Sequence, residues 1–239
     1  MASQSAPQPI PASRQLIASP LNTLIVVAVV ALNAYRGVLN AARFHAGLGT
    51  TRTHMYLRTI VAELVVLGIV VTGVRLRGAS LQTVFGHRWH SAGQVVRDLG
   101  LGVILLITST GVVSILSGLR DGGHDNQSIS YLLPQTSTEL LLWLTLSLTA
   151  GICEEAIFRG YLQVQFTAMT RSAAAGILIS AGAFGAAHAY QGWGRALVII
   201  PMGVIFGIVA HWRGTVHPGM FAHTLQDAIA PFLLKLVDH

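Results

Sequence analysis

Charged residues are scarce in this sequence: Asp, Glu, Lys and Arg together make up 10% of its 239 residues, against about 25% in soluble domains. Lysine occurs only at Lys235, so the net charge of +6 comes almost entirely from arginine. The arginines stand singly between apolar runs, and this scatter excludes a basic patch for nucleic acid. We therefore expect a polytopic membrane protein whose first partner is the lipid bilayer, and no nucleic-acid partner.

Other absences narrow the function further. Cys153 is the only cysteine, which excludes a disulfide framework and a thiolate metal cluster, and we interpret it as a small buried hydrophobe. The sequence lacks the HExxH motif, so an ordinary zincin is excluded. Buried Glu and His residues also relay protons in transporters, but the chain shows no pair of broken-helix repeats typical of that class.

Long apolar runs are what the sequence has instead. Hydrophobic residues make up 52% of the chain, and the mean hydropathy is +0.61. Runs of this length predict an all-α fold, a polytopic membrane helical bundle of about seven transmembrane helices, and the motifs given below place the catalytic core in the last four. The protein is expected to be integral and multi-pass, in the cell membrane if its source is bacterial. The predicted helices cover 21–39, 57–74, 99–119, a stretch opening at 140, 173–190, 196–212 and 218–236.

The order of these runs predicts the domain organisation. Residues 1–20 are rich in Ser, Gln, Ala and Pro and are predicted to be a disordered polar leader. Residues 21–120 hold the N-terminal transmembrane helices, and residues 136–239 hold the catalytic core. The first apolar run is short and follows Arg14, as in a cleaved signal peptide. A clear cleavage site is missing, however, and this favours a retained span.

Two adjacent acids interrupt one of the apolar runs. A capping box, TSTE at 136–139, opens a helix that stays uncharged until Glu154 and Glu155. A charge in mid-membrane costs at least ~2.5–3.5 kcal/mol, so each acid needs a partner. Glu155 and Arg159 are four residues apart and can pair on one helix face, whereas Glu154 points about 100° away. We interpret Glu155 with Arg159 as structural and Glu154 as functional.

Further polar residues are expected at the depth of Glu154. We interpret the polar GYLQVQ segment at 160–165 as the point where this helix leaves the hydrocarbon. Arg171 is midway between Glu154 and His188, so a hairpin there would place the two at equal depth. His223 and Asp227 share one face of the last helix, and His223 is about nine residues from the connection near Gly214, or ~13 Å at 1.5 Å per residue. We therefore predict one layer of catalytic residues, Glu154, His188, His223 and Asp227.

This set of side chains can perform two kinds of chemistry. A glutamate beside an imidazole can deprotonate a water molecule as a general base, and a second imidazole can donate a hydrogen bond to an oxyanion. These are the parts of an amide-bond hydrolase. The same residues could instead bind a divalent metal such as zinc through Glu154, His188 and His223. Both alternatives stay open at this point.

Three short motifs also carry a family resemblance. EEAIFR (154–159), FGAAH (184–188) and HTLQD (223–227) resemble the EExxxR, FxxxH and HxxxN/D motifs of one family. It is the family of CAAX prenyl protease 2 and bacteriocin-processing proteins, which includes the Abi and lysostaphin-resistance-protein-A-like members. The order of the motifs is the same and their spacing is comparable. The resemblance covers about residues 140–236, while the first three spans carry no motif that belongs to it.

The resemblance implies an intramembrane endopeptidase that acts on a membrane-associated peptide or protein. By resemblance, Glu154 and His188 activate water, His223 and Asp227 stabilise the oxyanion, and the supporting residues are Glu155, Arg159 and Phe184. An ionised Asp227 cannot donate the hydrogen bond that the Asn of other members donates, so it is expected to orient His223 instead. The alternative is a non-catalytic membrane immunity or scaffold protein of the same family.

Overall fold

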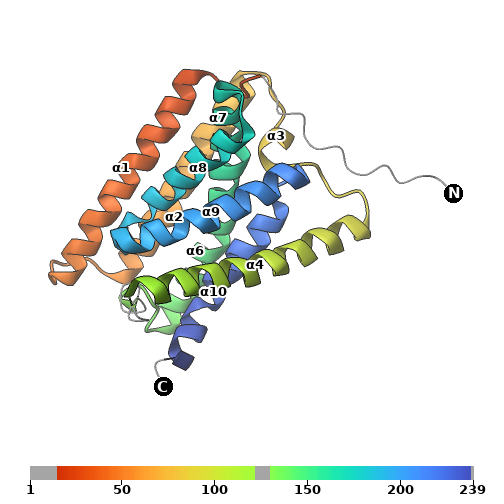
Figure 1. Ribbon diagram of the computed structural model, residues 1–239. Coiled ribbons are helices and arrows are strands. Elements are labelled where there is room, and N and C mark those ends of the chain that lie inside the picture. The colour runs from red at the N-terminus through yellow and green to blue at the C-terminus, as the bar shows by residue number, and fades with distance from the viewer. Residues whose placement is uncertain (1–14, 122–129, 238–239) are drawn as a thin grey trace.

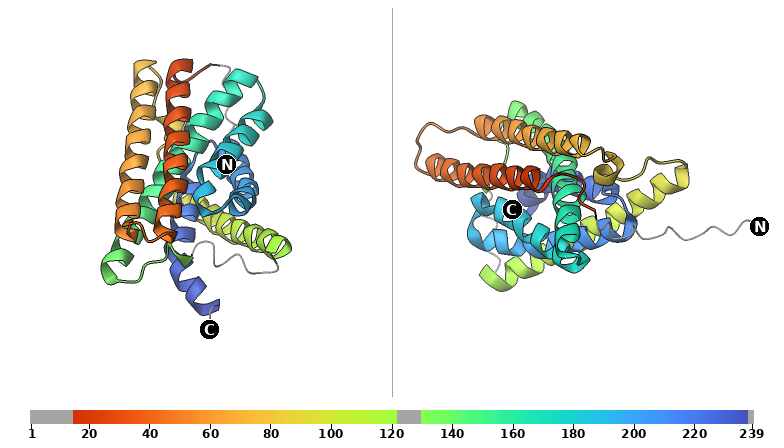
Figure 2. Two further views of the ribbon diagram at one scale, coloured as in Figure 1. Left: turned by 90° about the vertical axis from the view of Figure 1, so that its left-hand side faces the viewer. Right: turned by 90° about the horizontal axis from the view of Figure 1, so that it is seen from above.

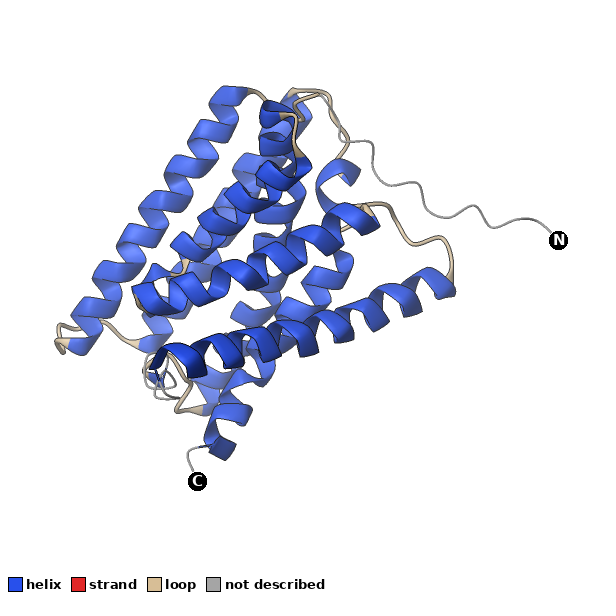
Figure 3. Cartoon of the chain, viewed as in Figure 1, coloured by secondary structure: helices blue, strands red, loops and turns tan. Residues whose placement is uncertain are grey.

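The computed structural model describes residues 15–121 and 130–237, and these are helical apart from short connections (Figures 1 and 3). Within them no strand occurs, only an isolated bridge between Gly86 and Thr215. One long helix changes its winding part-way, from α6 through the π-helical η2 to α7. The helices are α1 Pro20–His45, α2 Arg52–Leu76, α3 Gln82–Phe85, α4 Ala92–Asp121, α6 Ser137–Glu154, η2 Glu155–Leu162, α7 Gln163–Thr170, α8 Ala173–Ala187, η3 Ala189–Gln191, α9 Trp193–Arg213 and α10 His217–Val237.

The predicted helical membrane bundle is confirmed, because six of the seven predicted runs lie within helices and the seventh, 173–190, begins in α8 and extends past its end. Five helical stretches are long and apolar enough to cross a membrane: α1, α2, α4, the continuous helix Ser137–Thr170 and α9. Helix α8 is shorter, with 15 residues, and α10 has 21. The chain is an integral, multi-pass membrane protein.

The described part of the chain begins before the first predicted span. The prediction of a disordered leader falls mainly on residues 1–14, which lie outside the described residues. Ile17 and Ala18, at the end of that predicted leader, are buried. Their backbone N–H groups donate to Gln165 Oε1 at 2.9 and 3.3 Å. This buried amide therefore fixes the chain just before α1.

The helix α6–η2–α7 occupies the centre of the bundle. It contacts α2 on one side and α8 and α10 on others, while α1 and α2 run side by side along one face (Figure 2). Helix α4 runs below α9 and crosses in front of α10 (Figure 1). Trp143 Nε1 on α6 donates to the backbone carbonyl of Asp227 on α10 at 2.8 Å. This bond fixes α10 against the helix that carries the two adjacent glutamates.

Small residues bring α8 and α9 together. A Cβ added at Gly203 would lie 3.0 Å from the Cβ of Ala181, and one at Gly185 would lie 2.7 Å from the carbonyl oxygen of Ala196. Membrane helices approach this closely only where side chains are small. The small residues of these two helices thus allow their backbones to pack closely.

Candidate active site

The helix that carries the site begins as predicted, with one difference. Thr136 Oγ1 accepts a hydrogen bond from the backbone N–H of Glu139 at 3.2 Å. The Glu139 carboxylate accepts from the N–H of Gln135 at 2.8 Å, one residue before the cap rather than from the cap residue itself. The cap satisfies two N–H groups at this end, and the uncharged helix then runs to Glu154.

At the two glutamates the helix changes from α to π. Residues Glu155–Leu162 form η2, in which every side chain is buried. Wider turns of this kind are rare and frequently occur at functional sites. The motif-based prediction assumed a regular α-helix here, and nothing in its spacing indicated the change. Glu154 is therefore the last α-helical residue before the irregular segment.

The predicted pair of Glu155 and Arg159 is present. Arg159 Nη1 donates to Glu155 Oε1 at 2.7 Å, and both side chains are about 1% exposed. The guanidinium also lies over the ring of Phe184, 4.1 Å from its centroid, where a cation is attracted to the aromatic face. The pair therefore balances its own charge inside the bundle, as a structural role requires.

Glu154 lies between two imidazoles. Its Oε2 atom is 3.8 Å from His188 Nε2 and 3.9 Å from His223 Nε2, and it makes no direct hydrogen bond within the described part of the chain. His188 Nδ1 donates to the carbonyl oxygen of Phe184 at 2.8 Å, since a carbonyl can only accept. This bond fixes the ring so that Nε2 faces the Glu154 carboxylate.

His223 is the most enclosed of the four predicted residues. Its Nδ1 atom is 3.2 Å from Glu155 Oε1, and its Nε2 atom is 3.6 Å from Asp227 Oδ2. The ring of Phe184 separates the two histidines, with its centroid 4.6 Å from His188 and 5.9 Å from His223. The fold thus brings together all four predicted residues and the three supporting ones.

One detail of the depth prediction was wrong. The predicted span 173–190 ends early: α8 stops at Ala187, and His188 is its C-terminal cap. The glutamines of GYLQVQ, Gln163 and Gln165, are buried inside the bundle. Gln163 Nε2 donates to the carbonyl of Gly207 at 2.9 Å, and Gln165 holds the segment before α1. The point at which this helix leaves the hydrocarbon stays a prediction.

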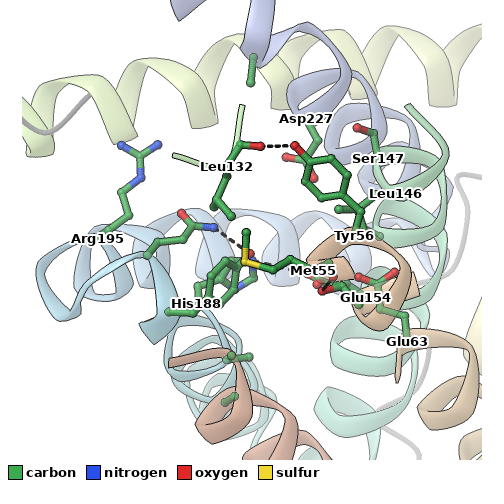
Figure 4. A pocket seen from close by; sticks show the side chains of 18 of the residues that line it. Met55, Tyr56, Glu63, Leu132, Leu146, Ser147, Glu154, His188, Arg195 and Asp227 are labelled. Atoms are coloured by element: carbon green, nitrogen blue, oxygen red, sulfur yellow. Dashed lines mark hydrogen bonds and ion pairs between the residues drawn. The ribbon is translucent and has the colours of Figure 1, made fainter. Parts of the chain in front are cut away.

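A cavity of about 750 Å³ opens beside Glu154 (Figure 4). This size is within the range of ~300–1,000 Å³ common for ligand sites. Glu154, His188 and Asp227 line it, whereas His223 is not among the lining residues and lies behind Glu154 and Asp227. Helices α1, α2 and α4 supply much of the remaining wall. The cavity of the predicted catalytic core is thus enclosed partly by N-terminal helices that carry none of the three motifs.

Glu63 on α2 also lines the cavity and was missed by the motif search. It is 8% exposed, and neither carboxylate oxygen has a hydrogen-bond partner in the described chain. A signal for it existed, because an acid inside an apolar span is a functional candidate by default. The three motifs lie only in the second half of the chain, and so none of them points to Glu63 on α2.

The predicted metal ligands Glu154, His188 and His223 do not form a metal site in this arrangement. Among the described residues, no group of three His, Cys, Asp or Glu side chains is placed to hold a metal ion. His223 already faces carboxylates with both ring nitrogens. The zinc prediction therefore gains no support from the geometry and stays a prediction.

The comparison with known families agrees with the motifs. Residues 136–229 match the family described as type II CAAX prenyl endopeptidase Rce1-like. We call this stretch the Rce1-like domain, after the family that it resembles. Searches of curated proteins and of solved structures gave no match. The Rce1-like family is a family of CAAX-type intramembrane peptidases. All four predicted catalytic residues lie inside the domain, whereas Glu63 lies outside it.

Within the Rce1-like domain, a glycine sets the approach of α10 to the site. A Cβ at Gly151 would lie 2.8 Å from the Thr224 nitrogen and 3.0 Å from the Met220 carbonyl oxygen. We expect Gly151→Ala to lower the free energy of unfolding by about 1–3 kcal/mol, because overpacking forces α10 away. Peptide cleavage should fall with it, since α10 carries His223. Denaturation in detergent micelles measures the first effect.

Gly182 provides the matched control for this substitution. It lies inside α8, and an added Cβ would meet nothing within 4 Å. Gly182→Ala is therefore expected to raise stability, by at most about 1 kcal/mol, through the higher helix propensity of alanine. If the two substitutions change the free energy of unfolding equally, the close contact with α10 is not the reason for glycine at position 151.

Proposed function

We propose that this protein is an intramembrane endopeptidase that hydrolyses a peptide bond of a membrane-associated peptide or protein. The observation that carries the proposal is the position of Glu154, with an unpaired carboxylate oxygen beside the Nε2 atom of His188 on the wall of a cavity. The proposal is also supported by the match of residues 136–229 to a peptidase family.

In the proposed reaction, Glu154 and His188 together hold one water molecule. The Glu154 carboxylate accepts a proton while the water oxygen bonds to the carbonyl carbon of the substrate, forming a tetrahedral oxyanion. His188 Nε2 accepts a hydrogen bond from the other hydrogen of the water and so orients it. Nε2 is free to accept because the ring carries its proton on Nδ1, which donates to the carbonyl oxygen of Phe184. The C–N bond then breaks, and the proton on Glu154 passes to the leaving amine.

Asp227 and His223 are proposed to act on the other side of Glu154. Asp227 faces the cavity and can touch a substrate, whereas His223 lies behind it. We therefore propose that His223 is a positioning residue that holds both Glu154 and Asp227 through Nε2 while Glu155 holds its Nδ1. The oxyanion role that the resemblance implies for His223 stays a prediction.

Substitutions of Asp227 distinguish two possible roles. Asp227→Asn is expected to keep kcat/KM within about tenfold of the wild type, because the amide can donate to the oxyanion and still contact His223. Asp227→Leu should lower kcat/KM by about 10²-fold, comparable to the loss of one polar group from an active site, because leucine makes no polar contact with His223 or with a substrate. Steady-state cleavage of one peptide measures both. If Asn is as damaging as Leu, the negative charge on Asp227 is what the site requires.

The proposed activity is tested by cleavage in water enriched in oxygen-18. A peptide library is incubated with the purified protein in neutral detergent, and the products are read by mass spectrometry. Hydrolysis places one oxygen from water in each new carboxyl terminus, so each N-terminal product should gain one heavy oxygen. A Glu154→Gln preparation made in parallel controls for contaminating peptidases.

Each result has a definite meaning. Labelled products from the wild type alone support the endopeptidase and give its cleavage preference. Equal products from both preparations overturn the role of Glu154. An absence of products across the library contradicts the endopeptidase and favours the non-catalytic immunity or scaffold function, which partner capture would then examine.

A further inference from the structure

Glu63 is an acid for which the reaction described above has no use. It lies on α2, outside the Rce1-like domain, yet it lines the same cavity as Glu154 and Asp227. Figure 4 shows Glu63 and Glu154 on one side of the cavity and Arg195 on the other. The cavity therefore has an acidic side, and part of it comes from the N-terminal helices.

Nothing in the described chain compensates Glu63. Neither carboxylate oxygen accepts a hydrogen bond, although the side chain is more than nine-tenths buried. The carboxylates of Glu154 and Asp227 are near enough to repel a negative charge on it. The nearest arginine along α2, Arg58, donates instead to the carbonyl of Asn33 at 3.1 Å. A buried carboxylate without a partner destabilises a fold, so its presence calls for a ligand.

We propose that Glu63 binds a positively charged group of the substrate close to the bond that is cleaved. The inference rests on the proposed endopeptidase function and adds a substrate class to it, peptides that place a cation in the cavity. A carboxylate at a cavity wall gives a charge-assisted hydrogen bond to an ammonium or guanidinium group. The cation is either a Lys or Arg side chain or a free N-terminal amino group, and the two sources share this chemistry.

The test measures peptide binding without cleavage. Short fluorescent peptides with one lysine, and twins with acetyl-lysine, are titrated against Glu154→Gln and against the double variant Glu63→Gln, Glu154→Gln in neutral detergent. We expect Glu154→Gln to prefer lysine, and the preference to fall by about tenfold, or ~1.4 kcal/mol, when Glu63 is also replaced. A second peptide pair, with a free or an acetylated N-terminus, shows which amine carries the preference.

The matched control is Glu139→Gln in the same Glu154→Gln background. Glu139 is an acid at the start of α6, and it is not among the residues that line the cavity. Glutamine at this position can still complete the capping box. The lysine preference should be unchanged in this control. A preference that is absent from the start, or that survives loss of Glu63, overturns the proposal.

Thermal unfolding of the Glu63→Gln protein provides a second readout. Removal of an unpaired buried charge should leave the Tm unchanged or raise it. A marked fall in Tm would show that Glu63 is held by a structural partner, which also contradicts the proposal. Because the binding assay needs no turnover, failure of the endopeptidase activity is seen separately in the oxygen-18 experiment.

Discussion

Replacement of Glu154 by Gln should lower kcat for peptide cleavage by about 10³-fold, within the range for loss of a general base. Glutamine has nearly the same shape as glutamate but cannot accept a proton from water, so KM should change little. The fold should be unaffected, because Glu154 Oε2 has no direct hydrogen bond to lose. Steady-state kinetics and thermal unfolding of the same preparation measure the two quantities.

Glu154→Asp is the informative companion variant. It keeps the carboxylate but withdraws it from His188 and His223, which are already 3.8 and 3.9 Å away. We expect activity between that of the wild type and that of Glu154→Gln. If Glu154→Gln retains more than about a tenth of the wild-type kcat, the general base in this reaction is another group.

Replacement of Arg159 by Met should have the largest effect on stability. It leaves the Glu155 carboxylate, which is fully buried, without its 2.7 Å ion pair. Removal of one partner of a buried pair costs about 3–5 kcal/mol, because the remaining carboxylate loses its guanidinium and keeps only the contact with His223 Nδ1 at 3.2 Å. Methionine fills much of the same volume, so the loss reports charge rather than a cavity. Chemical denaturation in micelles measures the free energy of unfolding.

A double variant tests the cause of this loss. With Glu155→Gln added to Arg159→Met, the uncompensated charge is removed, and most of the lost stability should return. Arg88→Met serves as the control: this exposed arginine should contribute within about 0.5 kcal/mol. If the double variant is no more stable than Arg159→Met, the contact of Arg159 with Phe184 is the main contribution.

Much of this molecule could be predicted from its sequence. Apolar runs interrupted by polar turns predict the helices, because a membrane requires every backbone group to be bonded within the chain. Charge inside such a run then indicates the site. The four-residue spacing of Glu155 and Arg159 predicts their pair, and equal distance from the turn at Arg171 predicts that Glu154 and His188 lie at one depth.

The remainder depends on contacts between distant segments. The change to π-helix at Glu155 leaves no mark in the residue spacing. The partners of Gln165 could not be predicted either, since only the fold shows that the chain before α1 binds its amide. Glu63 could have been found, but its association with Glu154 depends on the contact between α2 and α6, which no local pattern encodes.

The shared cavity has a consequence for how this protein can change. The residues of the candidate site lie in the segment with recognisable motifs, whereas helices α1, α2 and α4 line much of the cavity that a ligand would fill. Substitutions in those three helices can therefore alter which ligand is accepted without changing the site residues. A chimaera that takes these three helices from one relative and the motif-bearing segment from another should show the ligand specificity of the first and the reaction that both relatives share.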